Sequence, residues 1–341
     1  MRKQIKLSLL SVARLLGIFA LCRWWFRDRV RVLCYHGFSY ADEHLFRPKL
    51  FMTKQTFGKR LNYLANSRYQ VVSLQQALAN PQPLQVVLTM DDGWSGTFEL
   101  VQPELAQHHF PLMLYVTSYY ADKQIPVLNV ALSYLLWKTS NTTLQLTIPQ
   151  LAVDQSWSIA NLPSAELVKQ VCALIDQLEE PAHRAEVLQQ LADQLGVSLQ
   201  HHGQQLFRLL NIEELRALQQ HHVDLQLHTH RHCSPLQPEL FGRELEDNRQ
   251  WLAQFQDPAK LSHFCYPSGE YDAKHLPWLA QYQVNTATTT KTGLFAHGTD
   301  VLQIPRILDG EDVHILELEA ELCGFMTLIR QILRHERQVK G

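Results

Sequence analysis

One apolar segment ends in two adjacent carboxylates, and this feature constrains the fold more than any other stretch of the chain. Residues 86–90 (Val-Val-Leu-Thr-Met) are apolar or β-branched, which is typical of a strand buried on both faces. Asp91, Asp92 and Gly93 follow directly. Because two carboxylates do not fit inside such a strand, we expect them at its carboxyl end, offset by a cation, a proton or hydrogen bonds.

A histidine cluster follows a second strand-like segment far downstream. His228, His230 and His232 come directly after residues 223–227 (Val-Asp-Leu-Gln-Leu). One carboxylate and two imidazoles form a ligand set for a divalent metal with open coordination positions. His228 and His232 are four residues apart and would share a face on a helical turn. We therefore expect these two histidines, rather than His230, to bind the ion.

Strand and helix patterns alternate over most of the chain, which predicts a parallel sheet covered by helices, an α/β fold. The predicted strands span residues 30–35, 70–73, 85–90, 112–117, 223–227, 262–266, 284–289 and 302–307. The predicted helices span residues 55–66, 74–79, 101–108, 212–220, 240–254 and 273–281. Seven or eight such units fit a (β/α) barrel, whose chemistry lies at the carboxyl ends of the strands. The acidic pair, the histidine cluster and His36 all follow such ends.

We expect the barrel to occupy residues 31–320, with one interruption. Residues from about 130 to 205 contain two amphipathic helical segments, 165–178 and 185–195. This insertion is either a structural elaboration, a wall of the substrate mouth or a membrane-docking unit. A closing helix is predicted at residues 313–334, so that residues 321–341 form a C-terminal helix and tail.

Residues 1–30 differ in character from the barrel. Their apolar run of about 16 residues has Arg14 in its middle and basic residues at both ends. A spanning helix needs about 20 mostly apolar residues, and no clear cleavage site for a signal peptide follows the run. With Trp24 and Trp25 at the boundary, the pattern favours an amphipathic helix lying in a membrane interface. A signal anchor and a helix packed on the barrel are the alternatives.

Composition narrows the partners and the compartment. The net charge is −2, so nothing indicates a nucleic-acid partner. The six cysteines are scattered without CxxC pairs, which suits a reducing compartment. We therefore expect the protein at the cytoplasmic face of the inner membrane, as a peripheral protein. The alternative is a signal-anchored protein that faces the periplasm.

The paired carboxylates indicate a hydrolytic reaction. One of them can bind the metal while its neighbour remains free as a general base, and a metal-bound water is already acidified toward neutrality. This arrangement hydrolyses an amide or an ester without a covalent intermediate. Mutual structural capping of the two aspartates is the alternative interpretation.

Three motifs carry a resemblance to a known family. Residues 89–93 (Thr-Met-Asp-Asp-Gly) resemble the T-F-D-D-G motif of the polysaccharide deacetylases, the NodB-homology group of carbohydrate esterase family 4. Residues 228–232 (His-Thr-His-Arg-His) resemble their H-S/T-x-x-H motif, and residues 264–269 (Phe-Cys-Tyr-Pro-Ser-Gly) their third motif. The resemblance implies a distorted (β/α) barrel.

The resemblance also implies roles for individual residues. Asp91 would be the general base, and Asp92, His228 and His232 would hold the metal, usually zinc. Substrate contacts would come from a set of residues that follow two of the strands, namely Trp94, Tyr266, Pro267, Ser268 and Gly269. Backbone groups around Ser268 and Gly269 could donate to the oxyanion.

The chain departs from the family pattern in two places. Many members carry an arginine that orients the base where this chain has Cys265, and Arg306 is our candidate to replace it. The late histidine that serves many members as general acid has no clean match. His36, which follows the first strand, is our candidate for an active-site role.

The resemblance implies a metal-dependent hydrolase that removes N-acetyl groups from an amino sugar of a glycan or a lipid-linked glycan. The same chemistry would serve a deformylase or an amidase that acts on a related amide. A catalytically inactive carbohydrate-binding member of the fold is a third possibility. The intact Asp91, Asp92, His228 and His232 argue against it, because a binding module needs no free base beside a metal.

Overall fold

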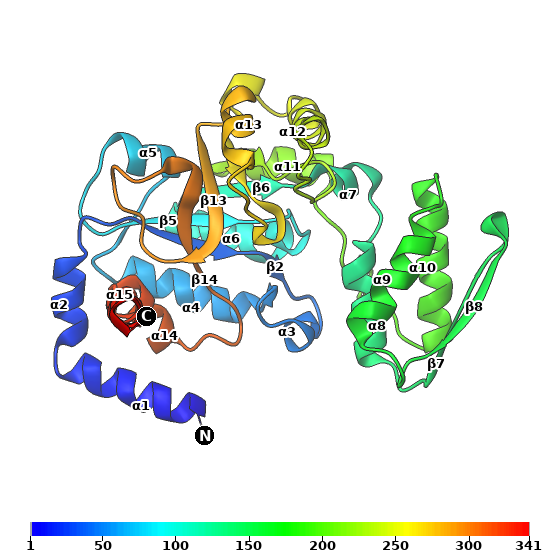
Figure 1. The fold of residues 1–341 in the computed structure, drawn as a ribbon, viewed down its shortest axis with the longest axis horizontal. Coiled ribbons are helices and arrows are strands. Elements are labelled where there is room, and N and C mark those ends of the chain that lie inside the picture. Colours follow the sequence, from blue (N-terminus) through cyan, green and yellow to red (C-terminus); the bar gives the residue numbers. More distant parts are fainter. Residues whose placement is uncertain (1, 341) are drawn as a thin grey trace.

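A computed structural model describes the backbone of residues 2–340 and the side chains of residues 3–333 (Figure 1). Seven parallel strands close into a ring, because β1 pairs with β14 on one side and with β5 on the other. Around the ring these strands are β1 (Arg31–Tyr35), β5 (Gln85–Met90), β6 (Leu112–Val116), β11 (Val223–Leu227), β12 (His263–Cys265), β13 (Thr286–Thr292) and β14 (Ile304–Leu308). The predicted (β/α) barrel is confirmed, with seven strands in the ring.

One of the eight predicted strands, at residues 70–73, lies outside the ring. β4 (Gln70–Val71) pairs with the first two residues of β5, while β6 takes the last three residues of the same β5 edge. β4 is therefore an edge strand below β6 and does not interrupt the barrel.

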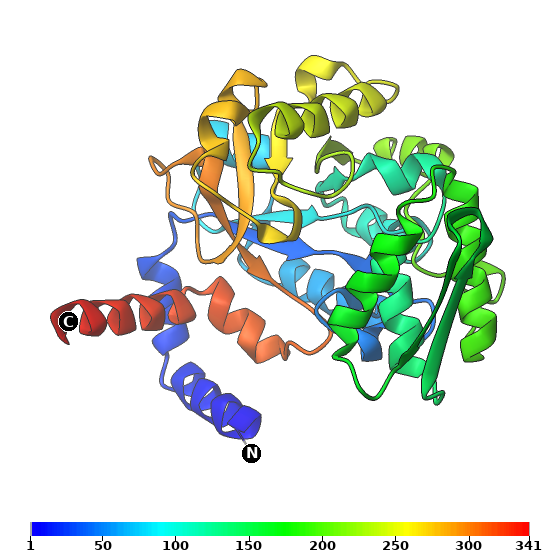
Figure 2. The same ribbon diagram turned by 45° about the vertical axis from the view of Figure 1, so that its right-hand side comes forward.

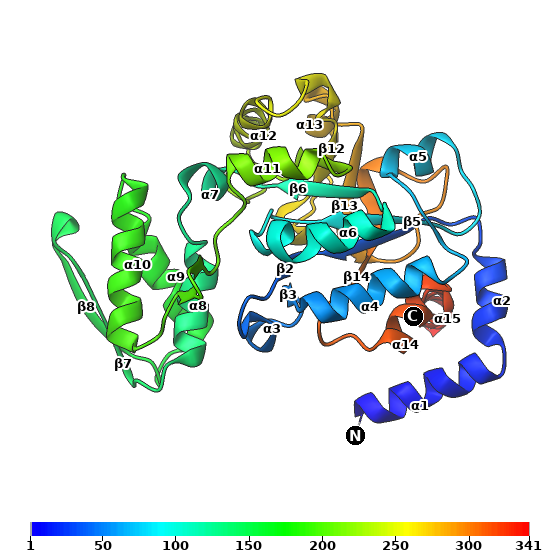
Figure 3. The same cartoon turned by 180° about the vertical axis from the view of Figure 1, so that it is seen from behind.

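Helices cover the outside of the ring (Figures 1 and 3). They are α4 (Lys54–Ala65), α5 (Leu74–Ala79), α6 (Gln102–His108), α7 (Ser118–Lys123), α11 (Ile212–Gln219), α12 (Pro238–Leu252), α13 (His275–Gln281) and α14 (Ile315–Leu322). Several begin at side-chain caps, such as Thr53 before α4 and the Asn211–Glu214 capping box before α11. Each of the six predicted helices is present to within a few residues.

Successive side chains along each strand point alternately into the ring and toward the helices outside it. Leu33 and Leu88 belong to a buried cluster that also contains Phe57 and Leu61 of α4, and so face the helices. Their neighbours, such as Val87, belong to a separate buried cluster that fills the ring. Both faces of each strand are therefore buried, which explains the continuous apolar runs in the sequence.

The insertion forms a small unit beside the barrel, with a hydrophobic core of its own (Figure 2). It contains α8 (Leu128–Lys138), β7 (Thr143–Ile148), β8 (Val153–Ser158), α9 (Ser164–Ile175) and α10 (Pro181–Leu195). The antiparallel hairpin of β7 and β8 was not predicted. Short pairs connect the insertion and the barrel rim, namely β2 (Gly37–Phe38) with β3 (Phe51–Met52), which flank α3 (Glu43–Phe46), and β9 (Gln200–His201) with β10 (Gln204–Gln205).

Glycines break both terminal helical segments into pairs. The N-terminal segment forms α1 (Arg2–Leu15) and α2 (Ile18–Trp25), with Gly17 at a φ of 77° between them. The closing helix predicted at residues 313–334 is likewise two helices, α14 and α15 (Phe325–Lys340), separated by Gly324 at a φ of 88°. Both glycines adopt the left-handed conformation, which other residues disfavour. Residue 341 of the predicted tail lies outside the described residues.

Within the described residues, a single helix long and apolar enough to cross a bilayer is not found. The α1–α2 pair meets the length and composition criteria only when taken together, and the two helices meet at a bend of 75°.

Candidate active site

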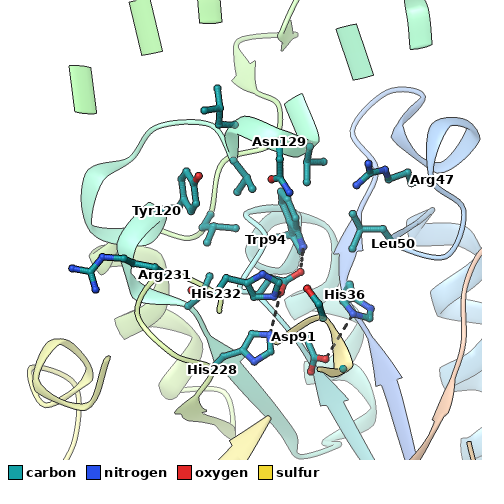
Figure 4. A pocket seen from close by; sticks show the side chains of 18 of the residues that line it. His36, Arg47, Leu50, Asp91, Trp94, Tyr120, Asn129, His228, Arg231 and His232 are labelled. Carbon is teal, nitrogen blue, oxygen red and sulfur yellow. Dashed lines mark hydrogen bonds and ion pairs between the residues drawn. The ribbon is translucent and has the colours of Figure 1, made fainter. Parts of the chain in front are cut away.

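A cavity of about 500 Å³ opens at the carboxyl end of the barrel. Its floor contains His36, Asp91, Asp92, His228 and His232 (Figure 4). Its opposite wall comes from the insertion and the segments that flank it, and includes Tyr120, Leu128, Asn129, Cys172 and Asp176. The insertion thus forms part of the cavity, and the acidic and histidine motifs lie together on the barrel side.

Strand register places each motif beside the end of a neighbouring strand. Tyr35 lies opposite Met90 in the β1–β5 pair, so His36 and Asp91 leave the barrel side by side. In the same way, Leu227 pairs with Phe264 of β12, which puts His228 level with Cys265.

Asp92 lies between the two histidines. Its Oδ1 is 3.2 Å from Nε2 of His228 and 3.1 Å from Nε2 of His232. His228 is fully buried, and its Nδ1 donates a hydrogen bond to the Cys265 carbonyl at 2.8 Å. This bond leaves the Nε2 lone pair directed toward Asp92, which is the arrangement of a metal-binding histidine.

Left-handed backbone conformations create this arrangement. Asp92 has a φ of 72° and Gly93 of 91°, so the chain reverses direction immediately after β5. Thr229 and His232 also have positive φ values, of 62° and 57°. The reason predicted for the histidine spacing is therefore wrong, because His228 and His232 converge through an irregular turn and not through a helical one.

The three side chains fit a divalent ion. Their donor atoms lie within 4.8 Å of one another, and the ligands of a tetrahedral zinc ion with bonds of about 2.0–2.1 Å are roughly 3.3 Å apart. Two further groups have donor atoms equally close, namely Cys34 with His36 and Asp91, and Asp91 with His228 and Cys265. Both of these depend on Asp91, whose two oxygens already accept hydrogen bonds from an arginine, so the Asp92 group is the better site.

Asp91 and Arg306 form a buried bidentate ion pair. The two terminal guanidinium nitrogens of Arg306 each lie 2.7 Å from a different oxygen of Asp91, and both side chains are almost completely buried. Burial alone would raise the pKa of Asp91, but the charge and the hydrogen bonds of Arg306 outweigh it and hold that pKa well below its usual range. The structure thus pairs Arg306 of β14 with Asp91, the residue that the family resemblance implies is the base.

His36 and two thiols complete the surroundings of Asp91. Nε2 of His36 is 3.7 Å from Asp91 Oδ2, and its buried Nδ1 has no hydrogen-bond partner within the described residues. The Cys265 and Cys34 thiols point at the same oxygen, from 3.3 and 3.6 Å. Burial raises the pKa of both thiols well above the usual value, so they act as neutral donors to the carboxylate.

Trp94 contacts Asp92 directly. Its Nε1 donates a hydrogen bond to Asp92 Oδ2 at 2.8 Å (Figure 4), and its ring packs edge-on against Phe51 with a centroid distance of 5.0 Å. The indole thus fixes the carboxylate oxygen that faces away from the histidines. Trp94 was predicted to contact substrate, and although it lines the cavity it is 4% exposed.

Only part of the third motif, residues 264–269, lines the cavity. Ser268 and Gly269 line the cavity, whereas Tyr266 is buried and donates its hydroxyl to the Leu302 carbonyl. Pro267 is also buried and does not line the cavity. The Gly269 N–H is already bonded to the Tyr266 carbonyl in a turn. Of the two N–H groups considered for the oxyanion, that of Ser268 is therefore the better candidate.

Sequence reasoning missed the residues that support the histidine turn. The buried Asn248 of α12 accepts a hydrogen bond from the His228 N–H and donates to the Val116 carbonyl and to Ser118 Oγ. Ser118 Oγ is also 2.8 Å from Nδ1 of His230, which is thereby held outside the metal-ligand group. No motif marks Asn248, since only its place on the buried face of α12 distinguishes it.

The segment that returns from the insertion is hydrogen-bonded to the loop that follows Asp92. The Leu210 N–H donates to the Gly93 carbonyl at 2.8 Å, and the Ser95 N–H donates to the Arg208 carbonyl at 3.2 Å. Trp94 itself forms an isolated antiparallel bridge with Leu209. The insertion therefore supports the loop that carries Asp92.

Comparison with known proteins identifies the family. The family model described as polysaccharide deacetylase matches residues 79–287, which is more than half of the chain. The chain belongs to the polysaccharide deacetylase family. It is therefore a hydrolase of a metal-dependent family, and the candidate ligand group of Asp92, His228 and His232 lines its cavity.

Solved structures agree with this fold. The Streptococcus pyogenes deacetylase PplD, in complex with acetate, is 15% identical with a TM-score of 0.56, over 87% of this chain and 99% of that one. IcaB from Ammonifex degensii is 16% identical with a TM-score of 0.54, over 87% of this chain and 97% of that one. The Aggregatibacter actinomycetemcomitans de-N-acetylase is 13% identical with a TM-score of 0.51, over 86% and 100%. None of the curated proteins compared with the chain matches it.

We expect Trp94→Phe to weaken metal binding about 10- to 100-fold, the usual effect of removing a hydrogen bond to a ligand. Phenylalanine keeps most of the packing against Phe51 but cannot donate to Asp92. Competition titration of zinc against a chelator measures this affinity. Trp157→Phe is the matched control, because the Trp157 indole donates to Gln170 within the insertion. Equal zinc affinity in the two variants would show that the indole does not position Asp92.

Proposed function

We propose that this protein is a metal-dependent N-deacetylase that releases acetate from an N-acetylated amino sugar of a glycan. One observation carries the proposal. Asp91 and Asp92 are adjacent in sequence but have separate partners, Arg306 for one and the His228–His232 pair for the other. The similar structures of deacetylases, including the one in complex with acetate, support an acetyl group as the acyl group that is removed.

The chemistry divides among the residues. Asp92, His228 and His232 would hold the ion, for which zinc is the best candidate because imidazole and carboxylate ligands with open positions are typical of catalytic zinc. Such an ion acidifies a water molecule and polarises the acyl carbonyl. Asp91, kept ionised by Arg306, takes the proton of the attacking water. His36, about 20% exposed and beside Asp91, is the candidate to protonate the departing amine.

We place the substrate at a membrane surface. The amphipathic α1 and α2 support a peripheral association with the membrane, and a lipid-linked glycan would be available there. All six cysteines are free, which favours the cytoplasmic face of the inner membrane. A signal-anchored enzyme that faces the periplasm is the alternative, and reporter fusions at each terminus distinguish the two.

Substitution of the base should separate metal binding from turnover. We expect Asp91→Asn to lower kcat by about a hundred- to ten-thousand-fold, the usual contribution of a general base, while the metal content stays at the wild-type level. Mass spectrometry of zinc-loaded protein with acetylated oligosaccharides and lipid-linked sugars follows the exchange of an acetyl group for hydrogen. Formylated analogues in the same screen test the deformylase alternative.

The matched control is Asp193→Asn, which removes an exposed carboxylate of α10. A full rate for Asp91→Asn would show that Asp91 is not the base. A wild-type protein that binds zinc and carbohydrate without turnover would instead identify an inactive member of the fold.

Removal of Arg306 should move the pH dependence of the reaction. In Arg306→Met the buried Asp91 loses the charge that opposes the effect of burial, so its pKa rises. The acid limb of the profile of kcat/KM against pH should therefore move to higher pH, because the base is protonated over a wider acid range. Arg306→Lys, which restores a positive charge, should move the limb part of the way back. An unchanged limb in Arg306→Met would contradict the pairing as the cause of the low pKa.

A further inference from the structure

The first terminal helix has two apolar faces. On α1, Leu10 and Ala13 are buried in a cluster with Leu316 and Ala320 of α14. A second set of apolar side chains points away from the barrel. They are Ile5, Leu9 and Val12, together with Leu16 directly after the helix, spaced by four, three and four residues and exposed by 54%, 66%, 52% and 72%. This spacing forms one continuous stripe on a helix, here called the outer stripe.

α2 repeats the pattern. Phe19 and Cys22 are buried against the same cluster, whereas Leu21, Trp24 and Trp25 are exposed by 62%, 58% and 70%. Adjacent exposed tryptophans are costly in water but favourable at a lipid interface, where the ring is buried and the N–H remains hydrated. We include these three side chains in the outer stripe.

α15, from the other end of the chain, packs beside α2 (Figure 2). Its ring of Phe325 packs on Phe19 with a centroid distance of 5.3 Å, and further along it exposes Ile332 and Leu333. Gly324 permits this packing, because a Cβ at that position would lie 2.5 Å from the Phe26 ring. The three helices therefore share one buried cluster, from which apolar side chains project outward.

Charge favours an anionic occupant for this surface. Among the side chains that the structure describes, residues 3–30 and 325–333 contain seven basic residues and one acidic residue, and the adjacent α14 adds three glutamates. This leaves an excess of three positive charges on these helices, in a chain whose net charge is −2. Lys6, Arg14 and Arg23 pair with glutamates of α14, which fixes their stems beside the apolar side chains. Apolar area combined with excess positive charge is the combination that binds anionic lipid surfaces.

The orientation of α1 relates this surface to the active site. Near its start, Lys3 donates to the carbonyl of Asp312, in the segment that follows β14 at the carboxyl end of the barrel. Directly after α2, the Phe26 carbonyl accepts a hydrogen bond from the guanidinium of Arg31, at the beginning of β1. α1 therefore runs along the side of the barrel, beneath α14, from one end of the strands toward the other (Figures 1 and 3).

A small groove lies between this helix and the rim of the cavity. It has a volume of about 120 Å³ and is lined by Lys6 and Leu10 of α1, together with Leu308 at the end of β14. Leu308 is 42% exposed and also lines the active-site cavity. Leu308 therefore lines both the groove beside α1 and the active-site cavity.

We propose that the outer stripe docks on an anionic lipid surface with the barrel axis along that surface, and that lipid-anchored glycans enter the cavity past Leu308. This inference rests on the proposed function for its substrate, but the docking itself does not. It identifies the binding surface as one face of α1 and α2, supported by α15, and leaves the opposite face of each helix packed on the barrel.

Vesicle binding by the full chain tests the docking. We expect the wild-type protein to sediment with phosphatidylcholine vesicles that contain phosphatidylglycerol, and less so at high salt. Leu9→Glu should weaken this binding at least about tenfold, because it removes an exposed leucine that docking would bury in lipid and adds a negative charge. Leu45→Glu is the matched control, since Leu45 lies on α3, outside the stripe, and is 64% exposed.

The outcomes separate the two proposals. If the wild-type protein ignores anionic vesicles, or if Leu9→Glu and Leu45→Glu bind equally, the docking surface is wrong. Light scattering without vesicles tests the rival occupant, because a dimer that Leu9→Glu dissociates would assign the stripe to a second copy of the chain. All three proteins should deacetylate a water-soluble oligosaccharide at the same rate. If none of the three proteins, including the wild type, deacetylates the soluble oligosaccharide, the proposed function is overturned while the docking result stands.

A separate measurement tests whether a lipid-anchored glycan is the preferred substrate. On vesicles, the wild-type protein should show a higher kcat/KM for an acetylated glycan with a lipid anchor than for the same glycan without one. Leu9→Glu should lose most of that difference. Equal values for the two substrates with the vesicle-bound wild-type protein would refute entry of a lipid-anchored substrate past Leu308.

Discussion

The site depends on the separation of two neighbouring carboxylates. Asp91 continues the strand and extends over the mouth of the barrel, where Arg306 neutralises it. Asp92 adopts a left-handed conformation that turns its side chain toward His228 and His232. Without that turn, two buried negative charges would face the same region, and one of them would be forced to take up a proton. The backbone at Asp92 thus permits the division of roles that we propose, in which one carboxylate binds a cation while the other acts as the base.

The rest of the molecule holds this separation in place. A closed ring of strands puts His36, Asp91 and His228 at fixed heights, because each follows a strand whose register is determined by its neighbours. Hydrogen bonds from outside the strands then hold individual groups in place: Asn248 accepts a hydrogen bond from the His228 N–H, and the Trp94 indole donates one to Asp92. The insertion contributes through its return segment, which is bonded to the loop beyond Asp92. It is therefore a support of the site as well as one wall of the cavity.

Much of this could be predicted from local pattern. The strands β5 and β6 could be predicted because parallel strands are buried on both faces and therefore form continuous apolar runs. Their alternation with helices predicts the barrel. Arg306 was a candidate because it ends a late strand, but nothing in the sequence fixes its two bonds to Asp91. The roles of Trp94 and Asn248 depend on side chains brought together from distant segments, which local periodicity does not report. The hairpin of β7 and β8 was missed although residues 143–148 alternate clearly, because the helical segments around it dominated the interpretation of the insertion.

We propose that one cation is held by Asp92 and the two histidines. Diffraction from zinc-soaked crystals, recorded on both sides of the zinc absorption edge, tests it most directly. Our account predicts one anomalous peak about 2.0–2.2 Å from Asp92 Oδ1 and from Nε2 of both His228 and His232. An anomalous peak beside Asp91, His36 and Cys34 instead, or no peak within reach of Asp92, would contradict it.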